Sequence, residues 1–346
     1  MNYLQIITIE ENNKWDSIVR SFNNYDVNYL SGYAYAFQIH GDGEPLLFYY
    51  NDGNCRAINV VMKRDISEMD EFKESLDKNT WFDLSSPYGY GGFLVEGTYS
   101  EALIDEFDRY CSKNGFISEF VRFHLFNNFY QHYNGLSATY THNIIRTLDL
   151  PLEDMLMDFE HKVRKNIKRA TSSGLQIMID NTGERLEDFL RIYYNTMDRT
   201  GAQGNYYFRR EFFEALNKME GNYAYLHVLK DDIIISTELV LYGSENCYSF
   251  LGGTDSEYFN LRPNDFLKYE IIKWAKSLEL KRFILGGGYG EDDGIYQYKK
   301  SFAPNGIIDF YIGKKIFDNE KYNYLLNIRK SRSEQINDKY FPQYRG

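Results

Sequence analysis

The chain has 346 residues, and its 43% hydrophobic and 26% charged content excludes a disordered chain and allows a sizeable core. This length exceeds the usual size of a single core and favours two domains. The formal net charge of −11 excludes a general attraction to nucleic acid. We therefore expect no DNA partner, and any phosphate-bearing partner must be held by a local basic patch.

Cysteine and histidine usage indicates a reducing compartment and no metal. Cys55, Cys111 and Cys247 are far apart, odd in number and without metal-ligand spacing. The six histidines also lack such spacing, so we predict no metal site. The first 13 residues do not resemble a signal peptide, and no apolar run is long enough to span a bilayer. These features predict a cytoplasmic protein.

The first half is predicted to contain a hairpin, a strand that runs into glycines, a helix and a closing strand. The turn-forming run 51–54 (Asn-Asp-Gly-Asn) lies between two aromatic and aliphatic segments, which is a strong hairpin signal. The glycine-rich stretch 85–92 precedes the helix, for which Ser100 is the expected N-cap and Gly115 the stop. The predicted ranges are 46–50 and 55–63 for the hairpin, 81–84 for the strand, 100–114 for the helix and 116–126 for the closing strand.

The second half repeats this order after a strand and two further helices. The predicted ranges are 175–179 for the first strand, 185–199 and 208–219 for the helices, 223–229 and 233–242 for the hairpin, 247–251 for the next strand, 263–278 for the long helix and 281–285 for the closing strand. An acetyltransferase-like (GNAT) domain has this order of elements: strand, two helices, hairpin, strand, helix and strand. The analogy is evidence for the fold and only weak evidence for function.

The repeat predicts an α/β (α+β) fold of two tandem GNAT-like domains, each a mixed, largely antiparallel sheet flanked by helices. The expected domains are 1–150 and 151–317, with the boundary near Leu150-Pro151. The remaining residues, 318–346, are polar and partly helical, and no coiled-coil arm is visible in the sequence.

Several segments of the second half, taken together in order and spacing, resemble the FemAB-like family of acyltransferases, which includes the peptidoglycan-bridge aminoacyltransferases. The segments are 164–170 (RKNIKRA), 194–199 (YNTMDR), 248–254 (YSFLGGT), 261–264 (LRPN), 283–287 (FILGG) and 295–302 (IYQYKKSF). The resemblance implies two GNAT-like domains, an acceptor cleft at or near their junction, and transfer of an acyl group to an amine. The chain resembles the family members that lack a long helical arm. In those members the C-terminal helix packs back on the first domain, and we expect the same of 319–340 here.

Three functions are open on this basis. The leading hypothesis is transfer of an amino acid from aminoacyl-tRNA to an amine of a peptidoglycan precursor, with possible peripheral contact to a membrane-bound precursor. The second is an acyl-CoA-dependent N-acyltransferase that acts on an amino sugar for a surface polysaccharide. The third is a non-catalytic GNAT-like module that binds a partner. No cofactor is expected beyond the aminoacyl-tRNA or acyl-CoA donor.

The resemblance implies a catalytic role for Lys299, which matches a Phe-Lys-x-x-Phe segment of the family. There the lysine is thought to steady the acyl or phosphate end of the donor. Amide formation requires stabilisation of an oxyanion and close placement of both reactants. The alternative is that Lys299 and Lys300 are a solvated pair beside a buried Phe302.

The expected substrate-binding residues fall into three groups, of which the first comprises Arg199 and three tyrosines and the second the basic residues of one helix. Arg199 matches an arginine that contacts precursor phosphates, although a basic residue at a helix C-terminus is also favourable by itself. Tyr206, Tyr207 and Tyr248 are expected to line the same cleft or to be core aromatics. The basic residues of 161–169, with Arg164 and Lys168 four apart, are the expected phosphate patch or a solvated face.

Glycines at strand ends are the third group, because backbone there can approach a ligand closely. They are Gly252, Gly286 and Gly287. The segment 260–264 (NLRPN) stands where acetyltransferases cradle the diphosphate of coenzyme A. Pro263 has no N–H to offer a diphosphate, which favours the aminoacyl-tRNA donor.

Overall fold

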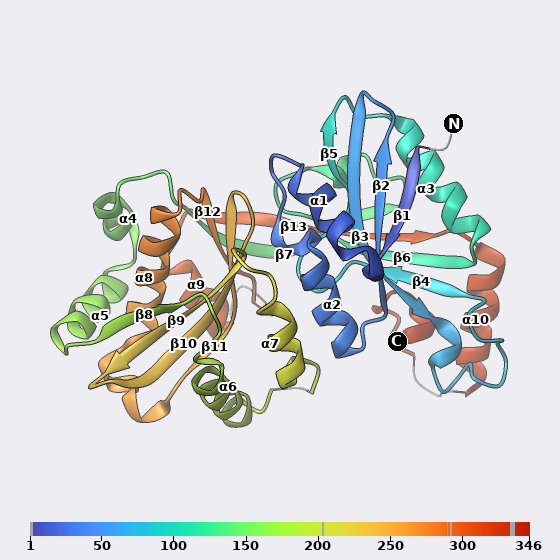
Figure 1. Cartoon of the computed structure of the whole chain (residues 1–346). Helices are drawn as coiled ribbons and strands as arrows, with labels where there is room; N and C mark the ends of the chain where they lie inside the picture. The colour runs from blue at the N-terminus through green and yellow to red at the C-terminus, as the bar shows by residue number, and fades with distance from the viewer. Residues whose placement is uncertain (1–2, 203, 289, 291–292, 333–335) are drawn as a thin grey trace. The chain divides into compact units, whose positions relative to one another are not determined.

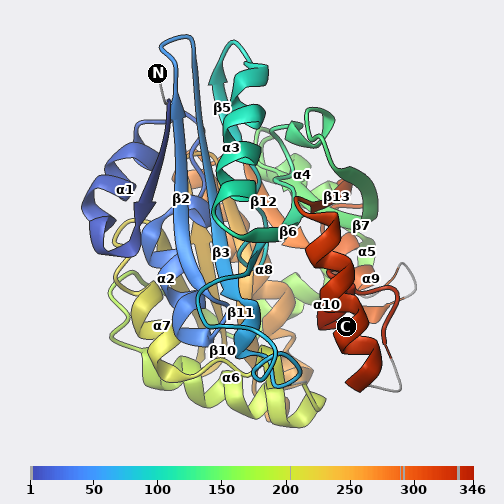
Figure 2. The same ribbon diagram turned by 90° about the vertical axis from the view of Figure 1, so that its right-hand side faces the viewer.

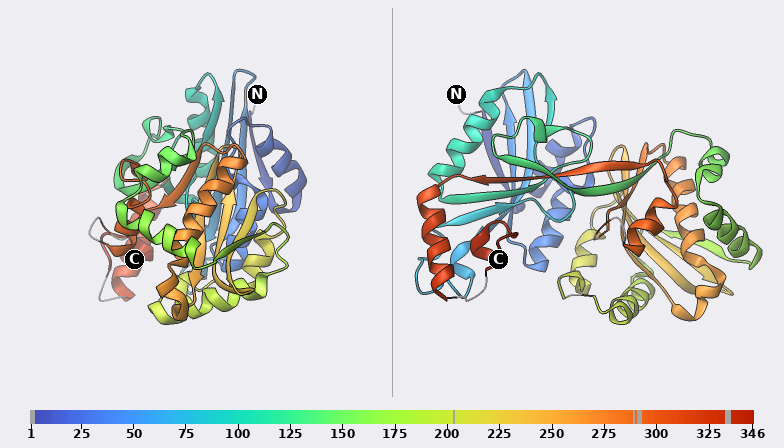
Figure 3. Two further views of the ribbon diagram at one scale, coloured as in Figure 1. Left: turned by 90° about the vertical axis from the view of Figure 1, so that its left-hand side faces the viewer. Right: turned by 180° about the vertical axis from the view of Figure 1, so that it is seen from behind.

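The computed structural model describes residues 3–202, 204–288, 290, 293–332 and 336–346. The chain divides into two compact units (Figure 1). Unit 1 comprises Met1–Phe22, Asn28–Tyr140 and Phe310–Gly346, and unit 2 comprises Asn23–Val27 and Thr141–Asp309. The chain passes from unit 1 to unit 2 within β7 (Leu136–Thr147) and returns within β13 (Ile307–Ile316) (Figure 3). These limits differ from the predicted 1–150 and 151–317 because the main stretch of unit 2, Thr141–Asp309, begins and ends inside strands and not in linkers.

The sheet of unit 1 is largely antiparallel. Its strands, in spatial order, are β1 (Leu4–Thr8), β2 (Glu44–Asn51), β3 (Cys55–Asp65), β4 (Phe82–Ser85), β6 (Phe116–Arg122) and the unit-1 part of β13, with β5 (Leu94–Gly97) paired to β3. Among the strand pairs of unit 1 that the structure describes, only β4–β6 is parallel. The predicted hairpin is confirmed, since β2 and β3 pair along their whole length from Glu44–Lys63 to Asn51–Arg56.

Helices cover both faces of this sheet. Phe107 of α3 (Glu101–Lys113) packs edge-on against Phe48 of β2, with 5.0 Å between ring centroids. Alternate residues of a strand point to opposite faces, and α1 (Asn12–Arg20) and α2 (Ser31–His40) cover the other face. Tyr322 and Leu325 of α10 (Asn319–Arg332) pack with Ile117 of β6, so the C-terminal helix belongs to unit 1 (Figure 2).

Unit 2 repeats the strand order of unit 1. Its strands, in spatial order, are β8 (Gln176–Asp180), β9 (Tyr223–Lys230), β10 (Ile233–Tyr242), β11 (Asn246–Thr254), β12 (Arg282–Gly286) and the unit-2 part of β7. The fourth and fifth strands are again the parallel pair. Two units with one order of strands, each mostly antiparallel and flanked by helices, confirm the predicted fold class.

The helices of unit 2 also form two layers. One face of the sheet packs against α5 (His161–Ser172), α8 (Pro263–Ser277) and the buried side of α9 (Gly294–Lys300), where Val163, Ile271 and Tyr296 enter one apolar core. The other face is covered by α6 (Leu186–Thr200), whose Phe189 ring packs against Tyr225 of β9, and by α7 (Arg210–Leu216), whose Phe213 ring packs against Phe189. A shorter helix, α4 (Leu152–Asp158), precedes α5.

Strands β11 and β12 separate partway along their length. They pair only from Asn246–Arg282 to Tyr248–Ile284. Beyond Tyr248, β11 continues to Thr254 beside β10, with an irregular register between Ser249 and Leu251. The predicted strand end at residue 251 is therefore too early, and Gly252 and Gly253 lie inside the strand. We call the region where β11 and β12 have parted the strand opening.

Candidate active site

Lys299 lies beside the strand opening because α9 is anchored at both ends. Asp293 caps the helix by accepting a hydrogen bond from the Ile295 N–H at 3.1 Å, while Tyr296 and Phe302 are buried in the core. The Lys299 ammonium then reaches back to donate to the carbonyl oxygen of Gly287 at 2.6 Å.

Two glycines at the end of β12, Gly286 as its last residue and Gly287 just after it, permit this approach. Gly286 has φ +83°, and a Cβ there would lie 3.3 Å from Lys299 Nζ. A Cβ on Gly287 would lie 2.9 Å from the carbonyl oxygen of His142. Larger residues at either position would therefore strain the backbone or crowd the ammonium.

The surroundings of Lys299 favour loss of its proton. Burial, reinforced by repulsion from the Lys268 ammonium, lowers the pKa of Lys299 to about 8, although Glu238 and Asp293 act in the opposite direction. A lysine that titrates near physiological pH beside an opening in a sheet is typical of a functional site. The position of Lys299 beside the strand opening is thus compatible with a role in acyl transfer. Its catalytic role stays a prediction.

A buried ion pair lies on the same side of the sheet. Lys268 of α8 donates to both carboxylate oxygens of Glu238 on β10, at 2.5 and 2.6 Å, and to Ser249 Oγ at 2.6 Å. Glu238 and Lys268 are only 6% and 8% exposed. None of these three residues is among the site residues predicted from the sequence. Glu238 carried a signal, because it is a charge within the strand 233–242, whereas Lys268 is one of several charged residues on α8.

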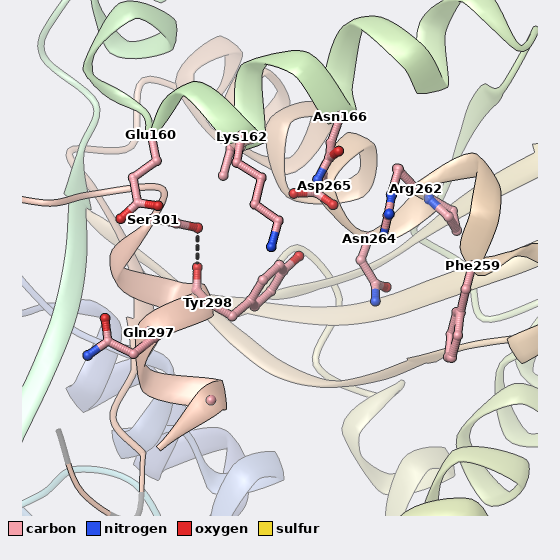
Figure 4. A pocket seen from close by; sticks show the side chains of 13 residues that line it. Glu160, Lys162, Asn166, Phe259, Arg262, Asn264, Asp265, Gln297, Tyr298 and Ser301 are labelled. Atoms are coloured by element: carbon pink, nitrogen blue, oxygen red, sulfur yellow. Dashed lines mark hydrogen bonds between the residues drawn. The ribbon is translucent and has the colours of Figure 1, made fainter. Parts of the chain in front are cut away.

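A pocket of about 480 Å³ lies between α5, the start of α8 and α9. Figure 4 shows the Lys162 side chain extending from α5 toward Tyr298 of α9, with Asn166 and Asp265 facing each other deeper along α5. Phe259, which is 39% exposed, forms the far wall. The pocket therefore offers the cations of Lys162 and Arg262, the carboxyls of Glu160 and Asp265, amide and hydroxyl groups, and an exposed aromatic ring.

The start of α8 is poorly suited to a diphosphate. Pro263 occupies the first turn and has no N–H, and Arg262 before it is in the left-handed region at φ +63°. The buried carboxyl of Asp265 also lies in this turn, and burial raises its pKa against the effects of Asn166 and Arg262. A carboxyl at a helix N-terminus competes with an anionic ligand for the same N–H groups. This supports the expectation that the usual coenzyme A mode is not used here.

The basic run on α5 is divided between two faces. Arg164 donates to the carbonyl oxygens of Met157 and Phe159, at 2.5 and 2.7 Å, and so holds the end of α4. Lys168 is exposed and, like Arg164, does not line the pocket. Lys162 does line it, because residues two apart point in different directions on a helix. Of this basic run, Lys162 lines the pocket, and phosphate binding by Arg164 and Lys168 stays a prediction.

Of the predicted residues near the end of α6, Arg199 and Tyr207 are exposed and Tyr206 is partly buried. The Arg199 guanidinium lies 5.0 Å from the centre of the Phe259 ring. Tyr207 stacks on Tyr194, with 5.1 Å between centroids, and its hydroxyl donates to Asp198 at 3.2 Å. The backbone oxygen of Tyr206 accepts a hydrogen bond from the Tyr193 hydroxyl. Arg199 therefore remains available to a ligand, whereas Tyr207 already has a partner.

Tyr248 and Gly252 lie in the interior of the unit. The Tyr248 hydroxyl donates to Asp26 at 2.5 Å, and the Asn246 amide donates to the same carboxylate oxygen at 2.7 Å. Asp26 is fully buried and Tyr248 is 6% exposed. A Cβ on Gly252 would lie 2.5 Å from the carbonyl oxygen of Thr237. Both residues have clear packing roles.

Removal of the Tyr248 hydroxyl should destabilise unit 2 without altering the strand opening. We expect Tyr248→Phe to lower the free energy of unfolding by about 1.5–3 kcal/mol, the usual range for a hydrogen bond to a charged group. Urea unfolding followed by circular dichroism measures this. Tyr242→Phe, a change on β10 at a partly buried ring, is the matched control. An unchanged midpoint for Tyr248→Phe would contradict the structural role.

Among the described residues, no three His, Cys, Asp or Glu side chains gather where they could hold a metal ion. Within those same ranges, no helix combines the length and apolar character required to cross a bilayer.

Comparison with known proteins identifies the class. Residues 157–300 match the acetyltransferase (GNAT) domain family. FemX, a solved structure, superposes with a TM-score of 0.66 at 15% identity, covering 94% of this chain and all of FemX. The C-terminal domain of a putative lysylphosphatidylglycerol synthetase from Agrobacterium fabrum superposes with a TM-score of 0.56 at 11% identity, covering 93% of this chain and 95% of that domain. The molecule is therefore a GNAT-fold protein.

One curated relative is similar in sequence to about half of this chain. The UDP-N-acetylmuramoylpentapeptide-lysine N(6)-alanyltransferase of Weissella viridescens is 26% identical over 199 residues, which is 54% of this chain and 57% of that protein. The chain thus matches little more than half the length of this relative. Together with the FemX fold and the GNAT match over residues 157–300, this similarity supports the resemblance of the chain to the FemAB-like family of GNAT proteins.

Proposed function

We propose that this protein is an aminoacyltransferase that moves an amino acid from aminoacyl-tRNA to an amine of a peptidoglycan precursor. The observation that carries the proposal is the Lys299 ammonium, held 2.6 Å from the Gly287 oxygen beside the strand opening of unit 2. The curated relative, a transferase of alanine to a lysine amine, supports the choice of reaction. The use of charged tRNA implies a cytoplasmic location. Any contact with the membrane would be peripheral, through a membrane-bound precursor.

The reaction requires the amine nitrogen of the acceptor to attack the ester carbonyl of the aminoacyl group. A C–N bond forms, the carbonyl electron pair moves to oxygen and returns, and the C–O bond to the ribose breaks. One proton leaves the amine and one is taken up by the ribose oxygen. The Lys299 ammonium, one of whose three N–H groups is used by Gly287, would hold the donor by its ester end or stabilise the oxyanion.

The pocket between α5, α8 and α9 is the proposed site for the end of the donor. Its exposed Phe259 ring suits stacking on a nucleobase, and Lys162 suits a single phosphate. Arg199, 5.0 Å from the same ring, is proposed to bind a phosphate at this wall. The acyl-CoA alternative is disfavoured by Pro263 and Asp265 at the start of α8, which leave little for a diphosphate to bind.

Donor choice is tested by incubating the purified full chain with UDP-N-acetylmuramoyl-pentapeptide and either tRNA charged with labelled amino acids or labelled acetyl-CoA. We expect label to enter the precursor only from charged tRNA. Label from acetyl-CoA, scored in parallel with amino-sugar acceptors, would replace the proposal by the N-acyltransferase alternative. Binding of the precursor without transfer from either donor would indicate the non-catalytic module.

A further inference from the structure

Ser249 occupies a special position on β11. It is the first residue after the last β11–β12 pair, Tyr248–Ile284, and so stands where the two strands begin to part. Its side chain is only partly buried. Gly286, next to the Lys299 ammonium, lies two residues after the last paired residue of β12. Ser249 of β11 and Lys299 of α9, whose ammonium lies beside Gly286 at the end of β12, therefore border the same strand opening.

The hydrogen bonds around Ser249 leave its hydroxyl proton unused. A lysine ammonium has three N–H donors, and those of Lys268 are taken by the two oxygens of Glu238 and by Ser249 Oγ. Because Ser249 Oγ accepts from an ammonium, its own O–H must be donated elsewhere. In the parts of the chain that the structure describes, the Ser249 hydroxyl donates no hydrogen bond.

The ion pair makes this hydroxyl a stronger and better-oriented donor. Donation from a cation into a hydroxyl oxygen polarises the O–H bond, and chains of hydrogen bonds strengthen one another in a low-dielectric interior. Glu238 and Lys268 are both more than nine-tenths buried and anchored on the sheet and on α8, so the donor to Ser249 is rigidly placed. Preorganised donors of this kind are what stabilise developing negative charge.

We infer that Ser249 is a further catalytic residue, whose hydroxyl donates a hydrogen bond to the carbonyl oxygen of the group being transferred, and that Lys268 and Glu238 are its positioning residues. The inference rests on the proposed acyl transfer. Ser249 keeps its proton throughout and forms no covalent bond. The contribution arises because negative charge grows on the carbonyl oxygen as the amine attacks, and the hydrogen bond strengthens with that charge.

The plain alternative is that Lys268 merely neutralises Glu238 and that Ser249 is the nearest acceptor for its third N–H. Buried ion pairs of this kind are often structural. The two interpretations differ in what loss of the Ser249 hydroxyl should do. A structural acceptor affects stability, whereas an oxyanion donor affects kcat with little change in KM.

The decisive variant is Ser249→Ala, because it leaves the ion pair intact. With charged tRNA and UDP-N-acetylmuramoyl-pentapeptide we expect kcat to fall about a hundredfold, the usual loss for one oxyanion donor, with KM nearly unchanged. Ser249→Thr, which restores a hydroxyl on a β-branched residue suited to a strand, should recover most of kcat. Ser244→Ala is the matched control, since that hydroxyl donates to Tyr25 O at 2.9 Å in the turn that precedes β11.

The positioning role is tested by removing both charges in Glu238→Gln with Lys268→Met, which leaves no unpaired buried ion. We expect kcat to fall in this background and Ser249→Ala to add little further loss, because residues that act as a unit are not additive. Full additivity would overturn the positioning role. If wild type transfers the amino acid and Ser249→Ala does so at the same kcat, the catalytic inference fails while the proposed function stands. If wild type transfers from neither donor, both fail.

Discussion

Replacement of Lys299 by alanine should reduce turnover at least a hundredfold while precursor binding is retained. The expectation follows from its place at the end of β12, where the ammonium is 2.6 Å from the Gly287 oxygen and borders the strand opening. Loss of one group that stabilises the oxyanion typically costs this much. Steady-state kinetics with charged tRNA give kcat, and calorimetry with the UDP-linked precursor gives its affinity.

The pH dependence identifies the active form of Lys299. Its pKa is lowered to about 8, mainly by burial, so the side chain is protonated below that pH and neutral above it. If the ammonium is the active form, kcat falls as pH rises through about 8. Lys299→Arg keeps the charge and should remove this decline. A rate that rises with pH would instead identify Lys299 as a base.

Lys300 provides the matched control for Lys299. It is the next residue of the same helix, and its alanine variant should retain wild-type turnover. Full activity of Lys299→Ala would refute the catalytic role and leave only the fold-level conclusions.

Replacement of Asp83 by alanine should strongly destabilise unit 1. This carboxylate is fully buried, and it accepts from Arg64 Nε and Arg345 Nε at 2.5 Å each and from the Tyr344 hydroxyl at 3.2 Å. Its loss leaves two partly buried guanidinium groups without their carboxylate. Breaking such a pair typically costs about 3–5 kcal/mol. Chemical denaturation measures the loss, and Asp70→Ala, which removes an exposed partner of Lys73, should change stability by less than about 1 kcal/mol.

The same carboxylate should make unit 1 sensitive to acid. Burial opposes ionisation of Asp83, but Arg64 and Arg345 outweigh it and hold its pKa below the usual value of 3.8. The folded state thus binds fewer protons than the unfolded state near that value. Its contribution is complete above pH 3.8 and is lost as pH falls through the lower folded pKa. An acid transition that is identical in Asp83→Asn would contradict this assignment.

Local patterns predicted most of the regular elements in the two sheets. The predicted helix 263–278 is α8, Pro263–Ser277, because Pro263 favours the first turn and its apolar residues recur at helical spacing. Strands β7 and β13 were missed, since their edges are polar and their pairing partners are remote in sequence. The predicted C-terminal helix 319–340 is helical from Asn319 to Arg332. Residues 333–335 lie outside the described residues, and residues 336–340 are not helical.

The candidate site was less predictable than the fold. Family motifs indicated Lys299, Gly286 and Gly287, which the structure brings together. Glu238, Lys268 and Ser249 come from three elements and meet only through strand register and the packing of α8 on the sheet. Tyr248 was chosen from its motif, but whether a tyrosine faces a ligand or a buried carboxylate such as Asp26 depends on contacts that sequence does not carry.

The two crossings inside β7 and β13 have a consequence for biosynthesis. Apart from Asn23–Val27, unit 2 is one continuous stretch, Thr141–Asp309, placed within unit 1. A ribosome therefore finishes unit 2 first, although it starts with unit 1. The N-terminal part of unit 1 can complete its core only after β13 has paired with β6 and Tyr344 has reached Ser118. The residues that are synthesised first are therefore the last to be fully packed.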